Sequence, residues 1–384
     1  MKIAMLGTKG IPATWGGVER HVEEIATRFV KMGHDVTVYC RPYYTTTNDE
    51  FYKGVRLKVL PTIQSKNYDA ITHTFIATMH LLMKDYDIVH YHALGPATMS
   101  LLPRLVGKKT VATVHGLDWQ REKWGHLAKY YLKFGERAAA VFPHATVAVS
   151  KYLKEYLEAG YKRNVYYIPS GVIEPEFLSP SIIRSYGLEG GDYILFVARL
   201  VPEKGCHYLI DAYKRLNTDK KLVIAGGSSH SDAYVKELQA SASDKVIFTG
   251  YVHGAELQEL FSNAYCYVQP STIEGLAITL LEAISYGRCV ITSDIPPNLE
   301  AAENIGLIFE NKNVDDLERV LRMAVEDPDM VAEYGQRART AGVAEYGFDS
   351  VAAKIEKVYT AIADGKKGQI VDLDTHSHEP TIPV

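Results

Sequence analysis

Two glutamates enclose a largely apolar segment in the second half of the chain. In the stretch EGLAITLLEA, Glu274 and Glu282 stand eight positions apart. The preceding PSTI loop and the apolar run predict a helix from about Gly275, with Glu274 at its N-terminus and Glu282 about two turns in. Because a buried carboxylate is tolerated only when it is paired or hydrogen-bonded, this placement favours acids that bind ligand hydroxyls, such as a diol. A capping acid and a solvated helix residue are the structural alternative.

The same predicted helix terminus offers backbone donors. The N–H groups of Gly275, Leu276 and Ala277 would have no partner within the helix, and such groups can hold a phosphate. A glycosidase also uses two carboxylates, but two turns of one helix would not hold them on opposite faces of one bond. The pattern therefore favours ligand binding over hydrolysis by an acid pair.

Two cations follow a predicted buried strand. Arg199 and Lys204 stand five positions apart in ARLVPEKG, after the strand YILFV. At the carboxyl end of a parallel strand they would point into a cleft, where a guanidinium fork and an ammonium group suit a diphosphate. On spacing alone, a pair of solvated surface charges is the alternative.

A glycine-rich loop follows the first predicted strand, KIAML. Four glycines, Gly7, Gly10, Gly16 and Gly17, separate this strand from the helix that begins VERHVEEIA. Free amides and the helix dipole at this point favour an anion. The spacing does not match the GxGxxG dinucleotide fingerprint, and plain loop geometry is the alternative.

The elements that carry these residues alternate between strands and helices. Both halves of the chain repeat strand, helix, strand, which predicts parallel sheets. The expected fold class is α/β, with two Rossmann-like, doubly wound domains at 1–172 and 173–347 that face a central cleft, the default ligand site. A helix at 348–363 is expected to pack back on the first domain, and 364–384 to be a disordered tail. Further helices are expected at 69–84, 96–106, 124–141 and 254–262.

The composition bounds the class of protein. The 384 residues suit two domains, and 47% apolar with 23% charged residues is an ordinary globular balance. The net charge of −4 gives no sign of a nucleic-acid partner. No apolar run approaches the ~20 residues that span a bilayer, and MKIAMLG is too short for the apolar core of a signal peptide. Scattered cysteines predict reduced thiols in a cytoplasmic protein: Cys40, Cys206, Cys266 and Cys289.

In this order, the motifs resemble those of a known enzyme family. RLVPEKG, EGLAITLLEA and GRCVITSDIPPNLE, with TWGGVERHVEEIA near the N-terminus, are similar to the retaining nucleotide-sugar glycosyltransferases of family 4 (glycosyl transferases group 1). The resemblance covers nearly the whole chain up to the tail and implies the GT-B fold. It implies transfer of a sugar from a nucleoside diphosphate sugar to a hydroxyl acceptor with retention of configuration. The expected pathway is the synthesis of a cell-surface polysaccharide or glycolipid.

The resemblance also implies roles for individual residues. Arg199 and Lys204 would hold the donor diphosphate. Glu282 would bind the ribose hydroxyls, and Glu274 the hydroxyls of the donor sugar. Phosphate contacts are implied for backbone groups: Gly16, Gly17, Gly275, Leu276 and Ala277. His115, in VATVHGLDW, corresponds to a histidine close to the transferred sugar, although a lone histidine is more often structural. The predicted catalytic residues are thus His115, Arg199, Lys204 and Glu274.

Three further positions in the first half are candidates for the acceptor side. Asp118 follows His115 by three residues, and His90 and His92 lie at another strand end in DIVHYHALG. Two positions depart from the family pattern. Ala198 stands where a glycine commonly precedes the arginine, and Ser170 stands where asparagine is usual. Neither departure removes a charged ligand, so activity is expected to survive.

A basic segment with interleaved aromatic residues spans 104–137. It holds eight bases against three acids, in a protein of net charge −4. A basic helix with aromatics can dock on anionic lipid headgroups, although a solvated helix with its aromatics in the core is the alternative. Because many similar enzymes use lipid-linked acceptors, the segment favours a peripheral position on the inner face of the cell membrane.

The expected chemistry needs neither a protein nucleophile nor a metal cofactor. Charge on the departing diphosphate would be met by Arg199, Lys204 and the helix-terminus amides. The partners would be a nucleotide-sugar donor and a carbohydrate or lipid-linked acceptor. A nucleotide-sugar epimerase of the same fold is the alternative activity, and a catalytically silent carbohydrate-binding protein is the second alternative.

Overall fold

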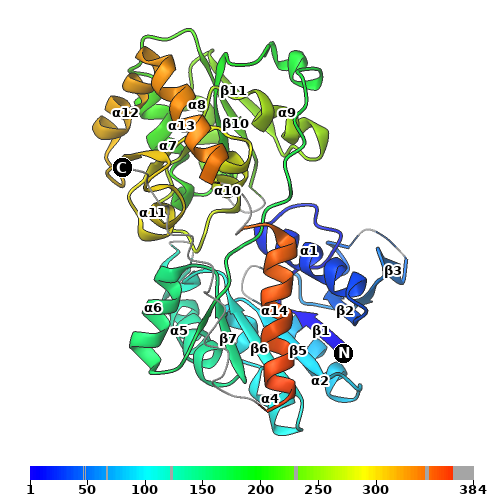
Figure 1. Cartoon of the computed structure of the whole chain (residues 1–384). Coiled ribbons are helices and arrows are strands. Elements are labelled where there is room, and N and C mark those ends of the chain that lie inside the picture. The colour runs from blue at the N-terminus through cyan, green and yellow to red at the C-terminus, as the bar shows by residue number, and fades with distance from the viewer. Residues whose placement is uncertain are drawn as a thin grey trace, which may run out of the picture.

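The structure, a computed structural model, has two lobes that each contain one β-sheet (Figure 1). It describes residues 1–45, 47, 49–65, 68–121, 124–228, 232–341 and 346–365. The predicted disordered tail therefore lies almost entirely outside the described residues. The α/β class with two doubly wound, parallel-sheet domains is confirmed.

The sheet of the N-terminal lobe has eight strands and is parallel except at one edge. The spatial order is β3 (Phe51–Tyr52), β4 (Val55–Val59), β2 (Asp35–Cys40), β1 (Lys2–Leu6), β5 (Ile88–His92), β6 (Lys109–Val114), β7 (Ala145–Ala148), β8 (Tyr166–Tyr167). Among the described strands of this sheet, only β3 and β4 pair antiparallel, in a hairpin that the sequence pattern did not predict. Alternate residues of β1 belong to two different hydrophobic cores. Ala4 and Leu6 pack in one core, and Ile3 and Met5 pack in the other. Both faces of the sheet are thus buried, as is usual for parallel sheets.

The helices of this lobe follow the predicted alternation with one correction. They are α1 (Gly17–Lys31), α2 (Asp69–Leu82), α3 (Leu94–Ala97), α4 (Leu101–Leu105), α5 (His126–Val141) and α6 (Lys151–Tyr161). The single helix predicted at 96–106 is wrong, because α3 and α4 are separate short helices. Pro103 has no N–H to bond back to Met99, and a proline is tolerated only in the first turn of a helix, so α4 starts just before it.

The C-terminal lobe repeats the architecture with a six-stranded parallel sheet. Its order is β11 (Val246–Gly250), β10 (Lys221–Ala225), β9 (Tyr193–Val197), β12 (Cys266–Gln269), β13 (Cys289–Ser293), β14 (Gly306–Phe309). The helices are α7 (Cys206–Tyr213), α8 (Asp232–Ser241), α9 (Ala255–Asn263), α10 (Ile278–Ser285), α11 (Pro296–Ala302), α12 (Val314–Glu326) and α13 (Pro328–Ala341). In β9, Leu195 and Phe196 again belong to different cores.

The last described helix, α14 (Phe348–Ala363), lies along the N-terminal lobe, as the orange-red helix of Figure 1 shows. The N–H of Val172 donates to the carbonyl of Tyr346 at 2.7 Å, and Val172 forms a parallel bridge with Gly347. Tyr359 is buried in the same core as Phe29 of α1, with 5.3 Å between ring centroids. The chain therefore passes between the lobes twice.

Each sheet reverses its strand order at one point. In the N-terminal lobe β1 lies between β2 and β5, and in the C-terminal lobe β9 lies between β10 and β12. The loops that leave two neighbouring strands at such a point run in opposite directions and leave a crevice at their carboxyl ends. Both crevices contribute to the site described next.

Candidate functional site

A cavity of about 290 Å³ lies between the two lobes. The N-terminal lobe contributes residues 13–16 of the loop after β1, residues 17 and 18 at the start of α1, and His115 after β6. The C-terminal lobe contributes Arg199 and Lys204, which follow β9, and Glu274, which follows β12. The predicted cleft between the domains therefore exists, and the segments after β1, β9 and β12 that line it leave the sheets where the strand orders reverse.

Glu274 is held at the cavity wall by two partners. The Lys204 Nζ lies 2.5 Å from its Oε1, and the Gln269 Nε2 donates to the same oxygen at 2.8 Å. The Glu274 side chain is 8% exposed. No described residue donates to Oε2, so the second carboxylate oxygen is available to a ligand. The ion pair fixes the carboxylate and balances its charge within the protein.

Arg199 presents a cation without a direct partner. No carboxylate in the described ranges lies within ion-pair distance of its guanidinium, although Arg199 is half-buried. Burial lowers the pKa of Arg199, and so does the nearby cation Arg121, against the attraction of Glu19, Glu203 and Glu274. A cation this poorly compensated is a natural place for an anionic ligand.

The helix that carries Glu282 begins later than the sequence predicts. It was expected from about Gly275, which is wrong, because α10 begins at Ile278. The backbone at Gly275 is pressed against the other lobe, where an added Cβ would lie 2.0 Å from the carbonyl oxygen of His115. The helix can therefore begin only after this contact with the other lobe. Glu274 therefore precedes the helix by a short loop, and Glu282 lies about one turn in.

The loop before α10 keeps its backbone donors free for a ligand. Gly275, Leu276 and Ala277 all line the cavity. None of the described residues accepts a hydrogen bond from their N–H groups. The donors for which phosphate contacts were predicted therefore belong to a loop rather than to the first turn of a helix.

Glu282 lies half-buried in the wall of the same cavity. Burial raises the pKa of its carboxyl to about 7, against the attraction of the cation Arg20. Arg20 comes from the first turn of α1 and also lines the cavity, as does Arg121. Neither arginine was among the site residues predicted from the sequence. The position of Arg20 just after the glycine loop could have indicated that it lies at the site, because that end of the helix faces the cleft.

The glycine loop brings α1 close to α10. Gly16 has φ = 107°, a conformation that residues with a side chain rarely adopt. A Cβ at Gly17 would lie 3.1 Å from the Ile278 Cδ1 across the cleft. The two helix N-termini therefore approach the cavity from opposite lobes. Ala198 and Ser170, the two departures from the family pattern, also line it.

The predicted acceptor-side residues do not line the cavity. His90 is fully buried, and its ring nitrogens bond to the Tyr359 hydroxyl at 2.6 Å and the Thr113 hydroxyl at 2.7 Å. This contradicts the acceptor-side prediction, because the ring faces α14 and not the cleft. His92 is also fully buried, and Asp118 forms an ion pair with Arg121 at 3.0 Å.

His115 lines the cavity from the N-terminal lobe, and His253 lines it from the C-terminal lobe. Burial, with a smaller effect of His90, lowers the pKa of His115 to about 3. The ring is therefore neutral at physiological pH, and its Nε2 lies 3.1 Å from the Nδ1 of His92. It can offer a hydrogen bond, but not a positive charge, to a bound sugar.

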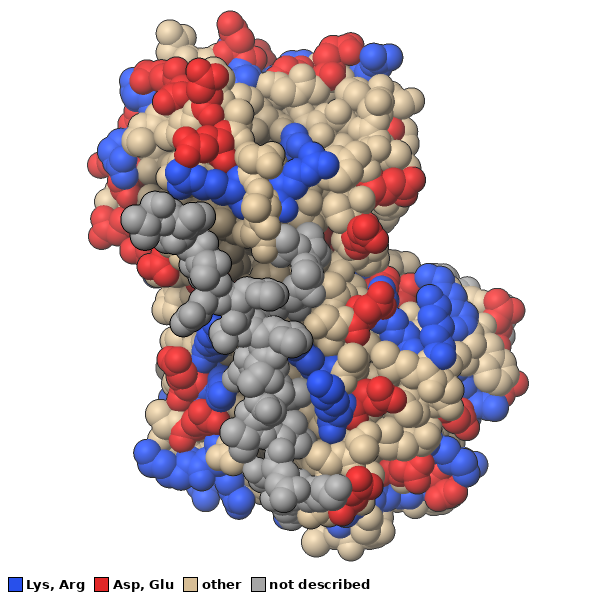
Figure 2. Space-filling view, viewed as in Figure 1, with Lys and Arg blue, Asp and Glu red and all other residues tan. Residues whose placement is uncertain are grey.

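The basic segment 104–137 includes helix α5, which has an exposed face. Residues 122 and 123 of the segment lie outside the described residues. Leu127 is 87% exposed, Tyr130 75% and Phe134 50%. Acidic and basic side chains are interspersed over the face of the molecule in Figure 2. None of the described helices has the length and apolar character that crossing a bilayer requires.

Comparison with known proteins finds relatives over most of the chain. The model of Glycosyltransferase Family 4 matches residues 15–174, and the model of Glycosyl transferases group 1 matches residues 180–341. An uncharacterized glycosyltransferase of Methanocaldococcus jannaschii is 28% identical over 403 residues. That alignment covers 94% of this chain and 98% of the relative.

Solved structures show the same fold. Sucrose-phosphate synthase from Thermosynechococcus elongatus matches with a TM-score of 0.81 at 19% identity, over 95% of this chain and 99% of the other. The Anabaena protein HepE, in complex with UDP and glucose, matches with a TM-score of 0.79 at 17% identity, over 94% of this chain and all of its own. The predicted GT-B fold is confirmed.

Proposed function

The chain belongs to the family 4 and group 1 glycosyltransferases, and we propose that it transfers a sugar from a nucleoside diphosphate sugar to a hydroxyl acceptor with retention of configuration. One observation carries the proposal: the two cations and two acids predicted from the sequence motifs all line one cavity between the lobes. They are Arg199, Lys204, Glu274 and Glu282. The complex of the structurally similar HepE with UDP and glucose supports a nucleotide-linked donor.

The donor diphosphate would lie beside Arg199 and the backbone amides before α10. Negative charge grows on this diphosphate as the sugar departs, and fixed donors aimed at that charge usually supply the largest part of catalysis. Lys204 can add an N–H while it remains paired with Glu274. The sugar hydroxyls would then donate to the free Oε2 of Glu274, and the ribose diol to Glu282.

Retention would follow from attack on the same face as the leaving diphosphate. Glu274 makes a poor nucleophile, because Lys204 and Gln269 hold its Oε1 and stabilise the charged carboxylate. The neutral His115 would contact the transferred sugar from the other lobe. The cations of the site make a metal cofactor unnecessary for the leaving group in this proposal.

The test is a screen of nucleotide sugars and acceptors with the Glu274→Gln variant. We expect transfer by the wild type, with the anomeric configuration of the donor kept in the product by NMR, and loss of transfer in Glu274→Gln without loss of fold by circular dichroism. Glu303→Gln, at an exposed glutamate of the same lobe, is the matched control. Full transfer by Glu274→Gln would overturn the assignment. Interconversion of the donor sugar without any acceptor would favour the epimerase.

We further propose that the acceptor is lipid-linked or destined for the cell surface, and that α5 rests on the inner face of the cell membrane. The exposed Leu127, Tyr130 and Phe134 would enter the headgroup region, while neighbouring lysines attract anionic lipid. Co-sedimentation with anionic liposomes should fall in the Lys129→Glu/Lys133→Glu variant. It should not fall in Lys236→Glu, on α8 of the other lobe. Binding that ignores the charge reversal would refute the α5 assignment.

A further inference from the structure

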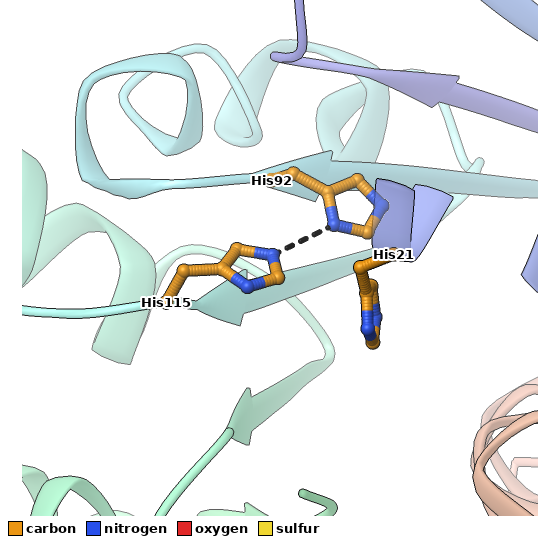
Figure 3. Close-up of side chains that lie close together, drawn as sticks. All are labelled: His21, His92 and His115. Carbon is orange, nitrogen blue, oxygen red and sulfur yellow. Dashed lines mark hydrogen bonds between the residues drawn. The ribbon is translucent and has the colours of Figure 1, made fainter. Parts of the chain in front are cut away.

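Three histidines meet directly behind the cavity. His21 comes from α1, His92 from the end of β5, and His115 from the residue after β6, so elements far apart in the chain bring the rings together (Figure 3). One ring nitrogen from each lies within 4.8 Å of those of the other two. The ring centroids of His21 and His115 are 5.2 Å apart, and those of His92 and His115 are 5.4 Å apart.

Two of the three rings have polar atoms without a protein partner. His21 is 1% exposed, and neither of its ring nitrogens has a hydrogen-bond partner among the described residues. The Nε2 of His92, in a fully buried ring, has none either. Buried polar atoms are nearly always satisfied, because an unpaired one loses its water without compensation. A cation bound in the cluster would take up one of the two unpaired nitrogens of His21.

The three rings suit a cation that accepts nitrogen ligands. A neutral imidazole can offer one ring nitrogen with a lone pair to a cation. Magnesium and calcium prefer oxygen ligands, whereas zinc binds imidazole readily.

We propose that His21, His92 and His115 form a binding site for a zinc-like divalent transition-metal cation. Three imidazoles in a tetrahedral site at ~2.0–2.1 Å from zinc have nitrogens roughly 3.3 Å apart. The His92 Nδ1 and the His115 Nε2 already lie at 3.1 Å, so mainly the His21 ring must rotate inward. The fourth position remains open to water or a ligand, because His115 lines the cavity.

Occupation of this site would inhibit the enzyme, a consequence that rests on the proposed function. The cation takes the Nε2 lone pair of His115 and holds the ring toward His92. The ring can then no longer adjust to the transferred sugar. The proposed metal site is thus separate from the cations that would bind the donor diphosphate. A metal bound there would lower the rate of sugar transfer.

The direct test is a zinc titration of the metal-free full chain by calorimetry, without any nucleotide sugar. We expect one saturable equivalent. The variants His21→Leu and His92→Leu should each weaken binding by more than the roughly 10–100-fold that loss of a supporting residue costs. His126→Ala removes an exposed histidine at the start of α5 and should leave the equivalent intact.

Cobalt(II) gives a second readout that needs no variant. Cobalt in a site of low coordination number absorbs strongly in the visible range, and we expect this spectrum in the wild type, with zinc abolishing it. Unchanged zinc stoichiometry and affinity in a folded His21→Leu variant would overturn the proposal, as would the absence of saturable zinc binding or of the cobalt spectrum. These measurements do not involve sugar transfer, so they stand apart from any failure of the proposed activity.

Discussion

Replacing Glu282 with glutamine should change how the stability of the protein depends on pH. Burial raises the pKa of this carboxyl from 4.5 to about 7 in the folded protein. Between pH 4.5 and 7 the folded state keeps a proton that the unfolded chain releases, so the stability falls as the pH rises through this window. At about 1.4 kcal/mol per pH unit, the ionised carboxylate costs the folded state about 3 kcal/mol by pH 8.

The measurement compares Glu282→Gln with the wild type by urea unfolding at a series of pH values. Glutamine carries no titrating proton, so the stability of the variant relative to the wild type should rise by about 3 kcal/mol between pH 4.5 and pH 8. Titrations elsewhere in the chain cancel in this difference. Glu303→Gln, at an exposed position, should show a difference that stays within about 0.5 kcal/mol at every pH.

The same group should make nucleotide binding depend on pH. Ribose hydroxyls donate to the ionised carboxylate and favour it, so the affinity of the wild type for UDP should increase as the pH rises toward 7, by up to about tenfold per unit. The increase should be absent in Glu282→Gln. A stability difference that is flat with pH would refute the burial argument. A pH-dependent difference with equal UDP affinities would instead refute the role of Glu282 at the ribose.

Three further predictions address separate contacts. Gly275→Ala places a Cβ 2.0 Å from a carbonyl oxygen of the other lobe, so the cleft should widen in small-angle scattering and transfer should fall, whereas Gly160→Ala, with nothing within 4 Å, should do neither. Arg199→Ala should lose affinity for UDP, and Arg199→Lys should recover only part of it, because an ammonium lacks the bidentate fork; full recovery would contradict this geometry. Tyr359→Phe leaves a ring nitrogen of His90 unpaired in the core, which should cost about 1–3 kcal/mol in urea unfolding while transfer by the folded variant persists. Loss of transfer in the folded Tyr359→Phe variant would instead support the prediction that His90 acts on the acceptor side.

The sequence was most informative where a residue follows a strand. Arg199 and Lys204 come after an apolar run that can only be a buried strand, and parallel strands present their carboxyl ends at one edge. Their position at the cavity could therefore be predicted without knowing the structure of the other lobe. The alternation of strands and helices predicted the two domains for the same reason, since it is a local property of the chain.

Features that depend on contacts between distant segments were beyond the sequence pattern. The start of α10 is set by the backbone of His115 pressing on Gly275, which no periodicity reports. His90 sits within a strand, and its orientation follows from the packing of Tyr359, 269 residues away. The unpaired nitrogens of His21 were equally hidden, because they become visible only when three elements converge.

The position of α14 has a consequence for the order in which the protein is made. The N-terminal lobe takes its last helix from the end of the chain, and Phe348, Ile355 and Tyr359 belong to its core. A nascent chain emerges N-terminus first, so the lobe whose strands appear first must wait for α14 to complete that core. Until then His90 lacks its tyrosine partner and one face of α1 stays uncovered. The C-terminal lobe, whose own segments have all emerged by then, can complete its fold earlier during synthesis.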